Sequence, residues 1–174
     1  LFLLNILLLI GTLSAQSGAE KIAKDYLIQE AENMGISQEL VDELILTDEY
    51  KTKHNGVQHL YFQQSINGIP VFNATLNVLI NKRNEVVVSG NRLIKGVEKS
   101  RLVSSAEITP EAAINAAALD SYPMSRNKVN PKMIQSNSAS DFLYHEANVS
   151  NSDIPVKLIY YMDHDKNLVL SWNL

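Results

Sequence analysis

Residues that could do chemistry are few in this sequence, and their spacing assembles no recognisable site. Four histidines are present, and none belongs to an H-E-x-x-H zinc motif. The nearest pair, His54 and His59, flanks Asn55–Gly56, and His54 is expected to pair with Val57 across that turn, so the two rings would not face each other. Isolated surface histidines are far more common than zinc ligands, and we therefore favour no metal site there.

A second candidate is the run from Asp163 to Asn167, which imitates the first five positions of a calcium loop. The sixth position is Leu168, where glycine is required, and the twelfth is Leu174, where a bidentate glutamate is required. We interpret residues 163–167 as a polar hairpin turn.

Other catalytic chemistry is equally hard to find. The sequence has no G-x-S-x-G nucleophile elbow and no phosphate-binding glycine motif. It has no cysteine, which excludes disulfides, thiolate zinc sites and cysteine nucleophiles. Asn73-Ala74-Thr75 and Asn148-Val149-Ser150 are glycosylation sequons, which matter if the source glycosylates exported proteins. The sequence therefore predicts no catalytic residue and no metal ligand in this chain.

Composition limits the classes of partner. The chain has 174 residues, of which 45% are apolar and 20% charged, with a net charge of −4. This length accommodates one ordinary domain or two small ones. An acidic pI near 5.5 without a basic stripe argues against a nucleic-acid partner, because phosphate neutralisation supplies most of that affinity.

The first 15 residues are mostly leucine and isoleucine, and no charged residue precedes Glu20. This run is too short to cross about 30 Å of hydrocarbon as a helix, and it ends in the small residues Ser14 and Ala15. It is typical of a secretory signal peptide, with cleavage expected after Ala15 and Ser17–Ala19 as a second possible site. Because the sequence begins with Leu1 and has no basic n-region, we expect it to start inside the signal. A buried N-terminal helix is the alternative. The mature chain is predicted to be secreted, without a stable membrane anchor.

The elements that follow predict a helix and an antiparallel meander. Ser17–Glu20 has capping-box spacing before an amphipathic helix that ends at Gly35, and Ser37 caps a shorter helix through about Leu44. Asn55–Gly56 is expected to join a strand ending near His54 to one beginning at Val57, and Asn67–Gly68 gives a second turn. The next strand alternates, and a polar turn at 82–84 leads into 86–88. On that alternating strand one face is expected to hold Phe72, Ala74, Leu76, Val78 and Ile80, and the other Asn73, Thr75 and Asn77.

A boundary is expected at residues 95–105, which are polar and show no sustained periodicity. Thr109 then caps a helix with Pro110 in its first position. A loop with Pro123, Pro131 and the Ser/Asn-rich stretch 136–140 leads to strands near 142–144, 156–162 and 168–172. The second unit is thus predicted as a helix followed by a three-stranded meander, cropped at its end.

The stretch 59–72 resembles the fungalysin/thermolysin propeptide domain. After an aromatic residue, Gln64, Gly68, Pro70 and Val71 hold the positions of that family's pattern, and an alternating strand and residues 86–91 follow in the expected order. The later part, with 108–113 opening a helix and 158–161 and 168–172 as strands, is similar to a PepSY-type propeptide segment. In fungalysin-like metallopeptidase precursors these units follow a signal peptide and precede the zinc catalytic domain.

The resemblance implies an α+β fold of two small units, each a helix packed on an antiparallel β meander of cystatin-like or PepSY-like type. The signal peptide would occupy residues 1–15, the first propeptide unit 16–94, the linker 95–105 and the PepSY-like unit 106–174. The implied function is that of a prosegment, an intramolecular chaperone and inhibitor of a secreted zinc metalloendopeptidase. Its partner in cis would be a thermolysin-type peptidase domain that follows residue 174 and holds the zinc. This chain alone would then be no enzyme, whereas the full precursor would be one.

Two alternatives stay open. The chain could be a free-standing exported module that inhibits a peptidase in trans or recognises a surface ligand, or an enzyme with an unrecognised site. For a prosegment, the residues expected to contact the catalytic domain are Gln63, Gln64, Asn67, Gly68, Ile69, Pro70, Asn73, Thr75 and Asn77. Gly68 and Pro70 could instead only shape a turn, Gln64 could make a structural hydrogen bond, and the Asn/Thr row could be a solvated face.

Overall fold

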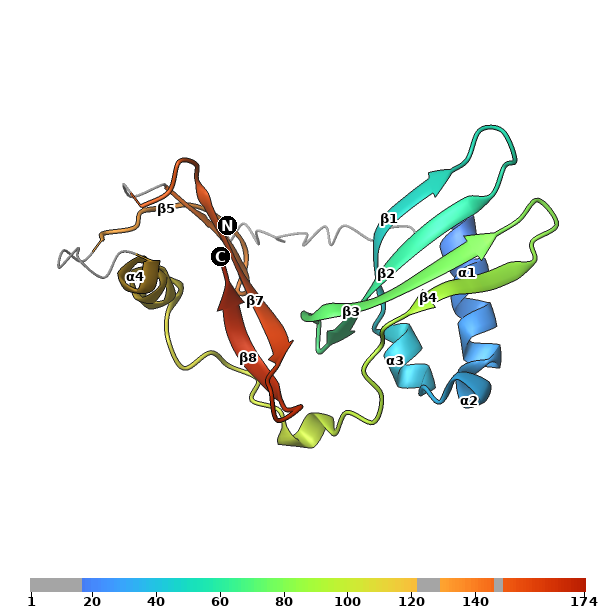
Figure 1. The fold of residues 1–174 in the computed structure, drawn as a ribbon, viewed down its shortest axis with the longest axis horizontal. Helices are drawn as coiled ribbons and strands as arrows, with labels where there is room; N and C mark the ends of the chain where they lie inside the picture. The colour runs from blue at the N-terminus through green and yellow to red at the C-terminus, as the bar shows by residue number, and fades with distance from the viewer. Residues whose placement is uncertain (1–16, 122–128, 146–148) are drawn as a thin grey trace, which may run out of the picture.

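The fold is α+β, and its strands form one eight-stranded sheet (Figure 1). A computed structural model describes residues 17–121, 129–145 and 149–174. The signal peptide predicted at 1–15 lies outside this range, as do the sequon residue Asn148 and the predicted loop residue Pro123. The elements in chain order are α1 (Gly18–Gln29), α2 (Ala31–Met34), α3 (Gln38–Asp42), β1 (Ile45–Lys51), β2 (Gln58–Ile66), β3 (Ile69–Ile80), β4 (Val86–Asn91), the 3-10 turn η1 (Lys99–Arg101), α4 (Pro110–Ser121), β5 (Met133–Ser138), β6 (Asp141–Tyr144), β7 (Ile154–Met162) and β8 (Leu168–Asn173).

The N-terminal helix starts where its cap predicts. The Ser17 hydroxyl accepts a hydrogen bond from the Glu20 amide at 3.0 Å and donates one to the Glu49 carboxylate at 2.7 Å. The reciprocal half of a capping box is replaced by an ion pair, because the Glu20 carboxylate lies 3.2 Å from Lys24. Gly35 closes the helical segment in the left-handed conformation, with φ of 63°. These caps fix the ends of the helices that cover one face of β1–β4.

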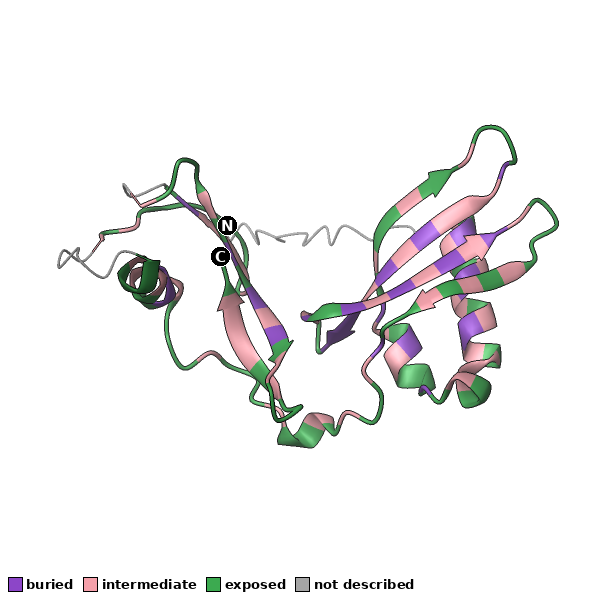
Figure 2. Ribbon diagram, viewed as in Figure 1, coloured by how far each residue is buried: buried purple, intermediate pink, exposed green. Residues whose placement is uncertain are grey.

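The first core lies between these helices and β1–β4 (Figure 2). Apolar residues on one side of α1 meet alternate residues of β2 and β3, as amphipathic patterning requires. The fully or nearly fully buried members are Ala19, Ala23, Leu27, Val41, Leu44, Leu60, Phe62, Leu76, Val78 and Ile80. The opposite face of these strands carries no helix among the described residues.

The two predicted Asn-Gly turns differ in the structure. Asn67 and Gly68 have φ of 53° and 78° and form the two-residue loop of the β2–β3 hairpin. Asn55–Gly56 lies in a longer loop, because β1 already ends at Lys51 and the Thr52 amide donates to the Val57 carbonyl at 2.8 Å. The prediction that a strand runs to His54 is therefore wrong, because residues 52–57 form the loop between β1 and β2.

The alternation predicted for β3 fails at its start. Ala74, Leu76, Val78 and Ile80 are buried as predicted, but Phe72 is 46% exposed and Val71 is buried in its place. The cause is a bulge: Gln63 pairs with Thr75 and Ser65 pairs with Pro70, so residues 71–74 all lie opposite Gln64. Asn73 takes a φ of 58° within this bulge. The extra residues reverse which side chains point to the helices.

Gln64, at 1% exposure, fills the space beside the bulge. Its side-chain amide donates to the Ile94 carbonyl at 3.0 Å and accepts from the Ile94 amide at 2.8 Å. The backbone N–H and C=O of the partly buried Ile94 are therefore both satisfied by the Gln64 side chain. Gln64 fixes the segment that leaves β4 against the middle of the sheet.

The second half contains one strand more than predicted. α4 begins at Pro110 with the Thr109 hydroxyl accepting from the Ala112 amide at 3.2 Å, as its cap sequence indicates. The stretch 133–138, expected to be part of a loop, forms β5 and pairs with β6. All six of its residues are exposed, so it shows no burial alternation that sequence analysis could use. β6–β8 pack against α4 through a core formed by Ile114, Tyr144 and Val156, with Trp172 of β8 at its side.

Residues 95–105 contain no strand, as expected, but some of their apolar side chains pack against the sheet. Ile94, Val97 and Leu102 cover a small core formed by Ile66, Val71, Ala74 and Tyr160. Here β3 and β7 meet in parallel at Val71 and Tyr160, and this contact joins both halves into one sheet. The unit boundaries predicted at 94 and 106 remain predictions.

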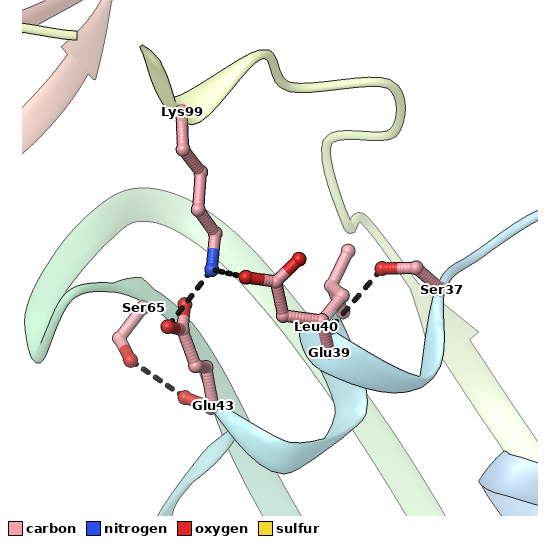
Figure 3. Close-up of polar contacts among 6 residues, drawn as sticks. All are labelled: Ser37, Glu39, Leu40, Glu43, Ser65 and Lys99. Carbon is pink, nitrogen blue, oxygen red and sulfur yellow. Dashed lines mark hydrogen bonds and ion pairs between the residues drawn. The ribbon is translucent and has the colours of Figure 1, made fainter.

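Lys99 ties this connecting segment to α3 (Figure 3). Its ammonium group lies 2.8 Å from both Glu39 and Glu43, and the Glu43 carbonyl accepts from the Ser65 hydroxyl at 2.6 Å. Burial alone would lower the pKa of Lys99, but its hydrogen bonds to the two carboxylates outweigh this effect and raise that pKa. The lysine therefore stays charged and holds the segment at neutral pH.

Replacing Gln64 with leucine tests the amide pair with Ile94. Gln64→Leu keeps the volume but leaves the partly buried N–H and C=O of Ile94 without partners, at about 1–3 kcal/mol each. We expect the free energy of unfolding in urea to fall by about 2–4 kcal/mol. The control Gln135→Leu, on exposed β5, should change it by less than about 0.5 kcal/mol. Equal effects of the two variants would contradict this role.

Tyr144→Phe tests the link between α4 and β6. The buried Tyr144 hydroxyl donates to Glu111 at 2.5 Å. This bond lowers the pKa of Glu111, while burial and the same bond raise the pKa of Tyr144. A depressed carboxyl pKa stabilises the fold above the unfolded-state pKa, and this stabilisation is lost as pH falls through the folded-state value. We expect Tyr144→Phe to cost about 1–3 kcal/mol in urea unfolding at neutral pH and much less once Glu111 is protonated. A cost independent of pH would refute the link.

Candidate docking surface

The described residues contain no catalytic or metal-binding constellation. No group of three or more His, Asp or Glu side chains lies close enough to hold a metal ion in the described ranges. The 163–167 segment is the hairpin turn between β7 and β8, in which the Asn167 amide donates to Asp163 at 2.8 Å. His59 stacks on Tyr50, with ring centroids 4.4 Å apart, and hydrogen-bonds Thr52 at 2.8 Å. None of the described helices has the length and apolarity needed to span a bilayer.

The residues predicted to contact a partner all lie on the β2–β3 hairpin. Gln63, Thr75 and Asn77 lie half-buried on the helix-free face, where Gln63 is the cross-strand partner of Thr75. Asn67 and Gly68 are exposed in the two-residue turn, and Ile69 and Pro70 are half-buried just after it. Asn73 is exposed in the bulge. The fold therefore brings eight of the nine to one hairpin surface.

Gln64 is the ninth, and it lies inside. At 1% exposure with its amide paired to Ile94, it has no surface to offer a partner in this conformation. Gln63 is also partly engaged, because its side-chain amide donates to the Val71 carbonyl and, at 3.2 Å, to the Ala74 carbonyl. Gln63 thus holds the bulge from the helix-free face, while Gln64 holds Ile94 on the other side of the strand.

Aromatic side chains on the same face were not among the predicted residues. Tyr50, His59 and Tyr61 form a stack across β1 and β2, with the tyrosine ring centroids 6.1 Å apart and their hydroxyls 3.4 Å apart. The hydrogen bond to the Tyr61 hydroxyl raises the pKa of Tyr50, so the Tyr50 phenol is neutral at physiological pH. Alternation on β2 could have shown His59 and Tyr61 to share a face with Gln63, since Leu60 and Phe62 are apolar.

A second aromatic pair lies where the two halves meet. Phe72 and Tyr161 are 46% and 44% exposed, and their ring centroids are 6.1 Å apart. Tyr161 is on the helix-free side of β7, because Tyr160 beside it points into the junction core. In Figure 1 the helices lie on the outer sides of both halves, so the uncovered sheet faces share the open side of a V. We call this surface, centred on Tyr50, His59, Tyr61, Gln63, Phe72, Thr75, Asn77 and Tyr161, the open face.

The open face carries exposed aromatic rings beside amide and hydroxyl groups. Aromatic side chains are enriched in protein–protein interfaces. A hollow of about 570 Å³ lies beside α4 and is lined in part by Ala113, Ala117, Leu170 and Trp172. It brings together no pair of groups that could act as acid and base or as metal ligands.

Comparison with known proteins places β1–β4 in a known motif. Residues 42–93, which contain β1–β4, match the fungalysin/thermolysin propeptide motif. The chain is 30% identical over 130 residues to an extracellular metalloproteinase of Aspergillus niger, covering 74% of this chain and 20% of that protein. It is 31% identical over 133 residues to extracellular metalloproteinase 10 of Uncinocarpus reesii (74% and 21%) and 24% over 166 residues to one of Pyrenophora tritici-repentis (95% and 24%). The chain thus spans about a fifth to a quarter of these relatives.

Gly68→Ala tests whether Gly68 is required by the turn itself. A Cβ there meets no atom within 4 Å, so any cost comes from the φ of 78°. We expect a loss of about 1–2 kcal/mol in urea unfolding, the cost of a left-handed alanine. Gly18→Ala is the matched control, since its Cβ also meets nothing and its φ is ordinary. A Gly68→Ala protein as stable as the control would mean that the glycine serves another purpose.

Proposed function

Because this chain carries a fungalysin/thermolysin propeptide motif at residues 42–93, we propose that it is the prosegment of a secreted zinc-dependent metalloendopeptidase. In this role it assists the folding of a catalytic domain and keeps that domain inactive until the connection is cut. The zinc and the catalytic residues belong to that domain, outside this chain. The observation that carries the proposal is the similarity of about three quarters of the chain to only a fifth of each of several extracellular metalloproteinases.

Two features of the chain support this role. The described residues supply a folded sheet with an open face but no catalytic group, as suits a module that acts by binding. The apolar stretch at 1–15 has the composition of a secretory signal, which agrees with the extracellular relatives.

We place the contact on the part of the open face near Tyr61, and we extend it to the turn Asn67–Pro70. Tyrosine is a frequent energetic anchor of interfaces because it buries a large rigid ring and keeps a polar tip. Asn77 pairs with Tyr61 across β2 and β3, and together they offer an apolar ring beside amide hydrogen-bonding groups. No helix must move for a catalytic domain to reach them.

A tethered inhibitor need not bind tightly. With an effective concentration of roughly a millimolar and an intrinsic Kd of roughly a micromolar, the site is occupied about 99.9% of the time. Cutting the connection lowers the concentration to the bulk value, so the inhibitor dissociates. One cleavage can therefore act as the activating switch.

Inhibition in trans tests the proposal. Residues 16–174 are titrated into a mature metalloproteinase of this family, ideally the product of the same locus, while peptide hydrolysis is followed. We expect dose-dependent inhibition, weakened at least about tenfold by Tyr61→Ser, as for loss of a hot spot worth about 1.4 kcal/mol or more. Ile134→Ser, an exposed apolar change on β5, is the matched control and should inhibit like the unmodified chain.

The outcomes separate the alternatives. Inhibition that Tyr61→Ser and Asn77→Arg leave unchanged would keep the prosegment role and reject the open face as the contact. Absence of inhibition and of binding up to tens of micromolar would reject the prosegment role and favour a free-standing exported module.

A further inference from the structure

The bulge in β3 displays a glycosylation sequon. Asn73-Ala74-Thr75 has the N-x-T form, and Asn73 is exposed. A sequon can be used only where the folded chain leaves room for a bulky, solvated sugar, and an asparagine within a regular paired strand would often lack it. The bulge removes this obstacle.

On the β2 side, the backbone around Asn73 lies outside the regular ladder, while Val71 pairs with Tyr160 of β7 on the other side. Between the pairs Ser65–Pro70 and Gln63–Thr75, residues 71–74 have no cross-strand partner of their own on β2 except Gln64. The Gln63 side chain holds this segment by its contacts with the Val71 and Ala74 carbonyls. With a φ of 58°, Asn73 adopts the conformation that asparagine tolerates better than most residues. The Gln63 side chain therefore holds the backbone of this segment, while the Asn73 side chain is exposed to solvent.

An aromatic surface adjoins the sequon. Phe72 precedes Asn73 in the chain, is 46% exposed and contacts Tyr161, which is 44% exposed. Exposed aromatic pairs of this kind leave apolar ring faces in water, which is unfavourable unless something covers them. The C–H face of a pyranose is a suitable cover, because its hydroxyl groups can remain solvated at the ring edge.

We propose that Asn73 is an N-glycosylation site and that its first sugar packs on the Phe72–Tyr161 pair. The donor is a lipid-diphosphate-linked oligosaccharide. The Asn73 side-chain nitrogen forms a bond to the anomeric carbon of the first sugar, the bond from that carbon to the phosphate oxygen breaks, the lipid diphosphate leaves and the amide loses one proton. No oxidant or reductant takes part.

The glycan also divides the open face. A sugar on Asn73 excludes a catalytic domain from that residue and leaves the Tyr50–His59–Tyr61 stack free, since Tyr61 pairs with Asn77, four residues further along β3. At about 3.3 Å per residue this separation is about 13 Å. The sequence predicts Asn73 as a residue that contacts the catalytic domain. In this proposal it instead carries the glycan, at the edge of the surface that the catalytic domain contacts.

The test uses residues 16–174 secreted by a yeast from a yeast signal sequence, so that failure here is independent of the prosegment role. Asn148→Gln removes the other sequon from every variant. We expect glycan on the peptide containing residue 73 by mass spectrometry, retained in Thr75→Ser and lost in Thr75→Ala and Asn73→Gly. Asn73→Gly suits the positive φ, so its secretion shows that loss of the glycan is not loss of folding. Secreted, folded protein that is unmodified at residue 73 would overturn the proposal.

Thermal unfolding tests the aromatic contact. Enzymatic removal of the glycan is expected to lower the Tm of the protein with Phe72 and to leave the Tm of Phe72→Ala almost unchanged. The same decrease in both would show that the sugar does not pack on this pair and would overturn that part of the proposal. Leu119→Ala, an equally exposed apolar residue on α4, is the control and should behave like the unmodified protein.

Discussion

β3 belongs to both halves of the sheet, and the bulge opposite Gln64 allows it to do so. Beyond the bulge, β3 presents Leu76, Val78 and Ile80 to the helices of the first half, while Ala74, at the end of the bulge, packs in the junction core. Before it, the phase is reversed, and Val71 points into the core where β3 meets β7 at Tyr160. A regular strand would place either Val71 or Ala74 on the solvent side, because side chains alternate with a period of two. The bulge therefore makes a continuous sheet possible.

Polar side chains maintain this irregular region. A bulge exposes backbone groups that a ladder would pair, and buried unpaired groups are costly. Gln63 donates to two carbonyls of the bulge, and Gln64 satisfies both groups of Ile94. Lys99, held between Glu39 and Glu43, fixes the following segment to α3. The two adjacent glutamines thus act on opposite sides of one strand, one toward the open face and one toward the interior.

The same arrangement leaves one side of the sheet accessible. The helices cover one side of each half, which leaves the other side of the sheet for a partner. The aromatic stack and the neighbouring amides give that side anchors and hydrogen-bonding groups without a strong charge. In the prosegment role that we propose, the partner is tethered, and a moderate affinity is then sufficient.

Local signals in the sequence determined the helices and most of the first half. Ser17, Gly35 and Thr109 mark helix ends because capping depends on nearby residues, and Asn67–Gly68 forms its turn because both residues tolerate positive φ. The α+β class and the likeness to a propeptide motif also followed from these patterns. Tertiary structure decided the phase of β3 at Phe72, the burial of Gln64, the strand at 133–138 and the joining of the two halves at Val71 and Tyr160. These features depend on partners distant in the chain: Ile94 for Gln64, β6 for β5 and β7 for β3. Periodicity records which face of a segment is apolar, but it does not record which distant strand that segment meets.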